Sequence, residues 1–267
     1  MTFPLRARDE SAARWDDLVA ELDCWAQVGR RAKLWWRDDD AAAETAALTR
    51  LLSLPGDAPL ALAVIPAFAE PSLFRLCESA PRVFFLQHGW RHENRAAAGE
   101  KKSEFPADRP PALVSSEIAR GRDRLLFLFG ERALKVFVPP WNRFAKSLLP
   151  FLRGCGIAAI SAFGPGRGAL CGLSQENTHL DLVAWQGGRG FIGEEAALSA
   201  LCAFLEQRRR SGREDAIGIL THHLLHTADT DAFLARLLPL LRLHRGARWL
   251  SPKELFAPAA AGMRGVG

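Results

Sequence analysis

Short runs with strand-like composition alternate with longer segments of helical periodicity along almost the whole chain. The predicted strands cover residues 33–37, 60–66, 82–87, 135–139, 157–163, 180–185, 216–221 and 247–251. The predicted helices cover residues 10–29, 42–53, 70–79, 115–130, 143–154, 194–211 and 229–244. The strand runs are nearly continuously apolar, which is typical of strands buried on both faces. The alternation therefore predicts a parallel sheet covered by helices.

The number of strand–helix units favours a barrel over an open sheet. Seven or eight units in about 250 residues suit a (β/α) barrel, whereas an open doubly wound sheet usually has fewer strands and a glycine-rich turn after the first one. No such turn follows residues 33–37, and no repeat or Pro/Gly/Ser-rich linker divides the chain. We therefore expect one α/β domain over residues 1–267, with an N-terminal helix (10–29), a barrel (33–251) and a short C-terminal tail.

Composition excludes several classes of function. With 267 residues and 48% hydrophobic residues, the chain can bury a substantial core. The net charge is +5, but the arginines are scattered except at 208–210, a run typical of a solvated helix face, so we expect no nucleic-acid partner. No apolar stretch reaches the ~18 residues of a membrane span. The N-terminus lacks the pattern of a secretory signal, and the five cysteines are widely separated, so a reducing cytoplasm is the expected location.

Polar residues capable of chemistry follow several predicted strands directly. Asp38, Asp39 and Asp40 follow the first strand, and the segments QHGWRHEN, PPWNR and THHLLH follow the third, fourth and seventh. In a parallel barrel these strand ends share one face, on which such barrels build their active sites. Three adjacent carboxylates repel one another and favour solvent. They therefore form either a solvated turn or part of a cation site.

His88 and His92 are four residues apart, so both imidazoles can converge on one point if the segment makes a helical turn. Such a pair alone is weak evidence for a metal. Together with one carboxylate from the Asp triplet, it makes a facial set of ligands that leaves positions open for water and substrate. The prediction is one divalent ion, with Zn as first candidate and Co, Mn, Fe or Ni as alternatives. A second Asp could deprotonate a water, and the third could stay solvated or pair with an Arg.

Two further strand ends carry candidate residues. Pro139 and Pro140 stiffen the chain before Trp141, which could be either a platform for a sugar ring or part of an ordinary turn. His222 and His223 follow the seventh strand, and their side chains point in opposite directions if the extended backbone continues. One of them could act as a general acid near neutral pH.

In this order, these residues resemble the motif series of the polysaccharide deacetylase family, which consists of metal-dependent carbohydrate esterases with the nodulation-deacetylase homology domain. The resemblance spans roughly residues 34–250. It implies that Asp39 is the catalytic base and that Asp40, His88 and His92 are the metal ligands. It also implies that Pro140, Trp141 and Arg143 contact substrate, that the Trp141 N–H stabilises an oxyanion, and that His222 is the catalytic acid. The implied fold is a distorted (β/α)7–8 barrel.

The resemblance implies hydrolytic removal of an acyl group, such as acetyl, from an N-acylated sugar. The chain departs from the family pattern at Val138, where the family carries an Arg that Arg143 could replace, and keeps only Asp181 and Trp185 of a fourth motif. Two alternatives follow. The substrate could be a small amide or ester, or the barrel could be a carbohydrate-binding or regulatory module without catalysis.

The long polar segment 93–112 has few helix or strand signals and is predicted to be a loop over one end of the barrel. A mobile solvent-exposed loop is the simpler expectation. Within it, Glu104 and Phe105 could nevertheless reach the site.

Overall fold

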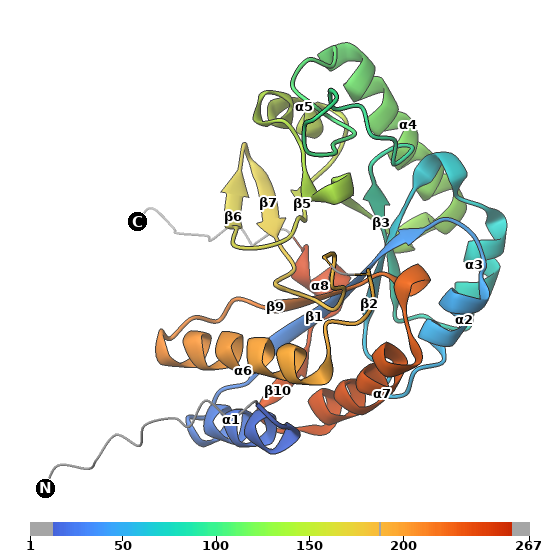
Figure 1. Cartoon of the computed structure of the whole chain (residues 1–267). Helices are drawn as coiled ribbons and strands as arrows, with labels where there is room; N and C mark the ends of the chain where they lie inside the picture. The colour runs from blue at the N-terminus through green and yellow to red at the C-terminus, as the bar shows by residue number, and fades with distance from the viewer. Residues whose placement is uncertain (1–12, 187, 258–267) are drawn as a thin grey trace, which may run out of the picture.

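The computed structural model describes residues 13–186 and 188–257, in which one ten-stranded sheet curls around a central core (Figure 1). Its strand order is β6-β7-β5-β4-β3-β2-β1-β9-β8, and β10 pairs with the first part of β1. Pairing is parallel except between β6 and β7. The strands are β1 (Ala32–Ala41), β2 (Leu60–Val64), β3 (Val83–His88), β4 (Ala133–Val138), β5 (Ala159–Ile160), β6 (Arg167–Leu170), β7 (Leu173–Glu176), β8 (Leu180–Asp181), β9 (Ile217–Thr221) and β10 (Ala247–Trp249).

Helices lie around the outside of the sheet (Figure 1). The α-helices are α1 (Trp15–Gln27), α2 (Ala46–Leu52), α3 (Pro71–Cys77), α4 (Pro111–Phe129), α5 (Leu149–Gly154), α6 (Glu194–Arg210), α7 (Ala228–Leu243) and α8 (Pro252–Leu255). Short 3-10 turns are η1 (Pro66–Phe68), η2 (Gly130–Arg132), η3 (Pro140–Asn142), η4 (Lys146–Leu148) and η5 (His223–Leu225). Three of these turns, η1, η3 and η5, follow strands directly and so help to shape the face at the carboxyl ends of the strands. Within the described part of the chain, no helix has the length and apolarity that a membrane span needs.

Residue alternation along the strands separates two apolar clusters. Trp36 packs into the larger cluster, which joins the outer face of the sheet to the helices. Trp35 points the other way and packs with Ala61, Leu86 and Val136 in a smaller cluster inside the curled sheet. Because successive strand side chains face opposite sides, β1 contributes to both clusters. The polar residues near the carboxyl end of β1 therefore lie at one end of a well-packed interior.

The two ends of the curled sheet approach each other at an irregular seam. Phe163, just after β5, forms an isolated parallel bridge with Thr178, just before β8. Thr178 N–H donates to Ala162 O at 3.0 Å, and Gly164 N–H donates to Thr178 O at 2.8 Å. These short contacts take the place of a regular strand pair. The result is the predicted distorted α/β barrel.

The predicted strands and helices are present, but several boundaries differ. β1 continues through Asp40 to Ala41 instead of ending at residue 37, because the polar side chains at its end have partners in the fold. β5 is much shorter than 157–163, and the helix predicted at 143–154 is η4 followed by α5. Residues 10–12 of the predicted first helix lie outside the described residues. The antiparallel hairpin β6–β7 was not predicted, because its first strand is RGAL, which has little strand propensity.

Candidate functional site

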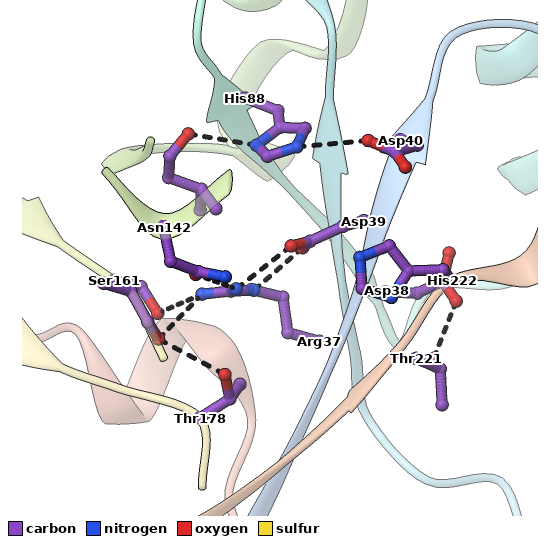
Figure 2. Close-up of polar contacts among 12 residues, drawn as sticks. Arg37, Asp38, Asp39, Asp40, His88, Asn142, Ser161, Thr178, Thr221 and His222 are labelled. Carbon is purple, nitrogen blue, oxygen red and sulfur yellow. Dashed lines mark hydrogen bonds and ion pairs between the residues drawn. The ribbon is translucent and has the colours of Figure 1, made fainter. Parts of the chain in front are cut away.

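An extra residue in β1 directs its three consecutive aspartates to three different places. Asp38 pairs with Leu62 of β2 and Ala41 pairs with Val64, so three steps along β1 match two along β2. This is a β-bulge. Asp40 lies in it with a φ of 73°, a conformation that few non-glycine residues adopt. The bulge breaks the alternation of side chains, so Asp40 follows neither the inward direction of Asp39 nor the outward direction of Asp38 (Figure 2).

The structure brings Asp40, His88 and His92 together. One ligand atom from each lies within 4.8 Å of the other two. Oδ1 of Asp40 is 3.2 Å from Nε2 of His88 and 3.3 Å from Nε2 of His92. The three side chains come from β1, from the end of β3 and from the loop after β3. Figure 2 shows the His88 ring next to the carboxylate of Asp40, and the other ring nitrogen of His88 faces Val138 O.

The chemistry of these three groups fits a divalent cation. His88 Nδ1–H donates to Val138 O at 3.0 Å, which leaves a lone pair at Nε2 of the neutral ring. Oδ1 of Asp40 is buried, and no hydrogen-bond partner is found for it among the described residues. Two imidazole nitrogens and a carboxylate oxygen that face one another could hold a cation between them. A set of two histidines and one carboxylate suits Zn and other first-row divalent metals.

The charges within this cluster shift the pKa values of its members. Burial opposes ionisation of Asp40, yet its contacts with the His88 and His92 rings outweigh burial and lower the pKa of the carboxyl group. Burial also disfavours the charged form of His88, but the close contact with Asp40 and the charges of Asp39 and Asp40 raise the pKa of this imidazole. For His92, burial and the neighbouring His88 together lower the pKa. The shifts of Asp40 and His92 are in the direction of the forms that bind a metal ion, a carboxylate and a neutral imidazole.

A buried glutamate shapes the segment that carries the two histidines. The four-residue spacing of the two histidines suggested a helical turn. The segment does not form one, because Gly89 and His92 have φ values of 61° and 55°. The carboxylate of Glu104 accepts the backbone N–H groups of Trp90 (3.2 Å) and Arg91 (2.7 Å). A Cβ atom at Gly89 would lie 2.0 Å from a Glu104 oxygen, so only glycine fits there. Glu104 therefore fixes the irregular turn that presents His92.

The expectation of a mobile solvent loop at 93–112 is wrong for the middle of that segment. Glu104 and Phe105 are fully buried. Arg109 forms a buried two-bond ion pair with Glu117 of α4, with distances of 2.8 and 2.9 Å. The loop is held by charge pairs and one aromatic side chain, which leave little trace in a hydrophobicity pattern.

Asp39 points into the barrel and is held by a neighbour on its own strand. Nε and Nη2 of Arg37 donate to the two carboxylate oxygens of Asp39 at 2.8 and 3.0 Å, and both side chains are buried (Figure 2). The remaining N–H groups of Arg37 reach Ser161 Oγ at 2.7 Å, Ala162 O at 3.3 Å and Asn142 Oδ1 at 3.2 Å. The guanidinium thus connects β1 with the segments that follow β4 and β5.

Arg37 was not among the residues singled out from the sequence. The expected substitute for the Arg missing at Val138 was Arg143, but Arg143 is exposed and donates to Lys102 O at 3.0 Å instead. The signal that could have identified Arg37 is its position two residues before Asp39 on one strand, because such residues share a face.

The turn after β4 places Trp141 beside the histidine cluster. The ring centroids of Trp141 and His92 are 4.3 Å apart. Trp141 and Asn142 have φ values of 54° and 56° in η3, and the hydrogen bonds of this turn run from the N–H groups of Asn142 and Arg143 to Pro139 O and Pro140 O. The N–H of Trp141 takes no part in these two turn bonds.

His222 lies on the inward face, next to two residues of the weak fourth motif. Its Nδ1 atom is 4.0 Å from Asp181 Oδ1, and its ring packs edge-on against Trp185 with centroids 4.9 Å apart. Trp185 Nε1–H donates to Asp181 Oδ2 at 2.7 Å. Burial raises the pKa of Asp181, although hydrogen bonds from Trp185 and Val183 oppose this shift. Asp181, Trp185 and His222 therefore form one group.

His223 points outward, away from this group, to Asp38. His223 Nδ1–H donates to Asp38 Oδ1 at 2.5 Å, and the Thr221 hydroxyl donates to Asp38 Oδ2 at 2.6 Å. Asp38 is fully buried, so the expected solvent-exposed or Arg-paired carboxylate is not found at this position. Burial opposes its charge, but the His223 imidazolium outweighs burial and lowers the pKa of Asp38. In return, Asp38 raises the pKa of His223 despite the burial of that ring.

No protein-family model matches the chain, and no curated protein matches its sequence. Solved structures do match its fold. A putative polysaccharide deacetylase from Mycobacterium smegmatis aligns with a TM-score of 0.61 and 16% identity, over 90% of this chain and 90% of that one. A family 4 acetyl xylan esterase from Clostridium thermocellum, in complex with cobalt, aligns with a TM-score of 0.55 and 16% identity, over 84% of this chain and 90% of that one.

A third structure extends this likeness to a eukaryotic enzyme. The chitin deacetylase of the fungal pathogen Colletotrichum lindemuthianum aligns with a TM-score of 0.52 and 14% identity, over 86% of this chain and 89% of that one. At these identities the alignments establish the fold. The chain has the curled α/β barrel of polysaccharide deacetylases and family 4 carbohydrate esterases.

Proposed function

From this fold and the site that it carries, we propose that the protein is a metal-dependent hydrolase that removes an acetyl group from an N-acetylated sugar or a related small amide. The observation that supports this most directly is the convergence of Asp40, His88 and His92 on one point. Asp39 and His222 come from the neighbouring strand ends of the same barrel face, as the separate base and acid of amide hydrolysis require.

A divalent ion held by Asp40, His88 and His92 would supply a Lewis acid for the amide carbonyl oxygen. Asp39 accepts a proton from the attacking water as the oxygen–carbon bond forms. The N–H of Trp141 donates to the carbonyl oxygen as that atom becomes negative. His222 donates a proton to the amide nitrogen as the carbon–nitrogen bond breaks, so acetate and a free amine leave.

The surroundings of the site favour a catalytic role over a purely binding one. The alternative of a carbohydrate-binding or regulatory module without catalysis rests on Val138, which stands where the family carries an Arg. Arg37 nevertheless gives Asp39 a buried partner through two hydrogen bonds. Without such a partner, the buried charge of Asp39 would be costly to maintain. Trp141 and Trp185 flank the site and offer flat apolar surfaces for a sugar ring. Arg143, exposed beside Trp141, remains the predicted contact to substrate polar groups.

The direct test combines metal analysis with product detection. The purified protein is loaded with Zn, Co, Mn, Fe or Ni, dialysed and analysed for bound metal. Each form is then incubated with N-acetylglucosamine oligomers, monomeric N-acetyl sugars and small acetamides, and released acetate is measured. We expect one ion per chain and acetate release from at least one class. A protein that binds no metal and releases no acetate in every form would contradict the proposal.

Replacing His222 by Ala should reduce turnover of amides far more than turnover of esters with good leaving groups. An amine must be protonated as it departs, whereas a leaving group such as nitrophenolate needs little help. We expect a loss of about 100-fold or more for an N-acetyl sugar and a clearly smaller loss for the activated acetate ester, with bound metal unchanged. Equal losses on both substrates would argue against an acid role. The same pattern in His223→Ala with an unaffected His222→Ala would transfer the role to His223.

Replacing Arg37 by Lys should lower kcat while metal binding is retained. Lysine keeps the charge but cannot form the two-bond fork that orients Asp39. Arg209→Lys is a matched control, since Arg209 makes the same Nε and Nη2 fork to Glu21, at 2.7 and 2.8 Å, between α6 and α1. We expect a loss of about tenfold or more in kcat for Arg37→Lys, and no change for the control. Unchanged kcat in a folded Arg37→Lys protein would show that the fork does not orient the base.

A further inference from the structure

A single buried carboxylate holds both sequence neighbours of His222. Asp38 Oδ2 accepts the Thr221 hydroxyl at 2.6 Å, and Asp38 Oδ1 accepts Nδ1–H of His223 at 2.5 Å. The Thr221 oxygen also accepts Nε1–H of Trp36 at 2.9 Å. All of these groups lie on the outer face of the sheet, so none of them faces the catalytic groups directly.

The imidazole of His222 has weak attachments of its own. Its Nδ1 atom is buried and no hydrogen-bond partner is found for it among the described residues. The carboxylate nearest to it, that of Asp181, is 4.0 Å away, beyond ordinary hydrogen-bond length. Both Asp181 oxygens already accept hydrogen bonds, from Val183 N–H at 3.0 Å and from Trp185 Nε1–H at 2.7 Å. The position of the ring therefore depends largely on the backbone that carries it.

That backbone is fixed from both sides by Asp38. Thr221 is the last residue of β9 and pairs in register with Asp38, whereas His223 begins η5. His222 lies between them with φ −138° and ψ 95°, and its carbonyl accepts Leu225 N–H at 2.8 Å. Asp38 also immediately precedes Asp39 and Asp40 on β1. One side chain thus couples the strand that carries the base and a metal ligand to the segment that carries the acid.

We infer that Asp38 and His223 are positioning residues that hold His222 where it can protonate the leaving group. This inference rests on the proposed function, because the role of His222 belongs to that proposal. Packing alone does not require an ion pair at this place. Apolar residues of similar volume could fill the same space between the sheet and the helices, often without loss of stability. Breaking the ion pair should therefore affect the acid step more than the steps that depend on Asp39 and the metal ligands.

The test uses two variants and one matched control. Asp38→Asn removes the charge with almost no change of shape. The paired variant Asp38→Leu with His223→Leu removes both charges together and leaves no unpaired buried ion, so it guards against a fold that fails with the single change. Asp231→Asn makes the same change as the first variant in another His–Asp pair, where His226 Nδ1 is 2.9 Å from Asp231 Oδ1. That control leaves the hydrogen bonds of Asp38 with Thr221 and His223 in place.

Each protein is loaded with metal, and kcat is measured on the best N-acetyl substrate and on an activated acetate ester. We expect metal stoichiometry and KM to stay near wild-type values in all variants. For Asp38→Asn and for the paired variant, kcat on the amide should fall by about 10- to 100-fold more than kcat on the ester. Asp231→Asn should show no such difference. Equal losses on amide and ester in both variants would overturn the inference, because lost stability lowers both activities alike.

A second measurement needs no catalysis. In metal-free protein labelled with nitrogen-15 at histidine, the His222 ring should give one sharp set of signals in the wild type and in Asp231→Asn, and shifted or broadened signals in the two Asp38 variants. Unchanged His222 signals in those variants would also overturn the inference. If the wild type hydrolyses neither substrate, the proposed function fails, whereas an active wild type with no amide-specific loss in the variants refutes only the role of Asp38 and His223.

Discussion

His88→Ala and His92→Ala should each abolish stoichiometric metal binding and amide hydrolysis together. Either change leaves Asp40 with one imidazole, and two protein ligands hold a divalent ion poorly. Removing a residue that only hydrogen-bonds to a metal ligand already lowers metal affinity by about 10- to 100-fold. Removing a ligand itself should therefore lower the affinity by more than ~100-fold. Bound metal is measured after dialysis against a weak chelator, and acetate release is measured on the same samples.

The fold should survive both changes. His92 lies on the loop after β3 and is partly exposed, and His88 is the last residue of β3. His244→Ala is a suitable control, since His244 also faces a carboxylate, that of Asp23 at 3.7 Å, but lies at the end of α7 away from the cluster. Circular dichroism and thermal unfolding should be close to wild type in all three proteins. Normal metal content in both His88→Ala and His92→Ala would refute this metal site.

Asp39→Asn should retain the metal ion and lose about 100-fold or more in turnover, the usual contribution of a general base. Asparagine is nearly the same shape, and its carbonyl oxygen can still accept a hydrogen bond from Arg37. It cannot take a proton from water. The expected signature is therefore full metal occupancy, a substrate KM near that of the wild type and a greatly reduced kcat.

Asp40→Asn is the natural comparison for this variant, because it makes the identical change one residue further along β1. It should weaken metal binding, since the buried Oδ1 that faces both imidazoles belongs to Asp40. The reverse result, with metal lost in Asp39→Asn and kept in Asp40→Asn, would mean that the two roles are exchanged. Thermal unfolding of each variant separates these effects from a loss of fold.

The sequence was sufficient to predict the architecture of the barrel and the residues that meet at its carboxyl-end face. The alternation of apolar strands with amphipathic helices identified β1 to β5 and β8 to β10, because burial on both sheet faces makes these strands apolar. The His88 and His92 pair followed from spacing, and the opposite directions of His222 and His223 followed from strand alternation. The choice of His222 as the inward one came from the family resemblance. The hairpin β6–β7 was missed, since its residues are held by backbone pairing more than by burial.

What the sequence did not reveal are the partners of charged residues. In the sequence, Arg37 looks like any other charged residue. Nothing in the neighbouring residues indicates that its side chain makes five hydrogen bonds and is completely buried. Glu104 accepts a hydrogen bond from the backbone N–H of Trp90, which is fourteen residues away in the sequence. It lies within a polar segment that is typical of a solvent loop. Asp38 and His223 are 185 residues apart. Such contacts depend on tertiary geometry, which apolar periodicity does not encode.

The β-bulge in β1 also has a consequence for comparing this chain with distant relatives. Three identical letters in a row can be shifted by one position in a pairwise alignment without any change in the score. The backbone does not allow that shift, because the added residue occurs at one place in the ladder and Asp40 alone of the three has a positive φ. Equivalent aspartates in remote homologues should therefore be matched by superposing the bulge and its neighbouring strand, since matching by letter could assign the ligand of one protein to the base of another.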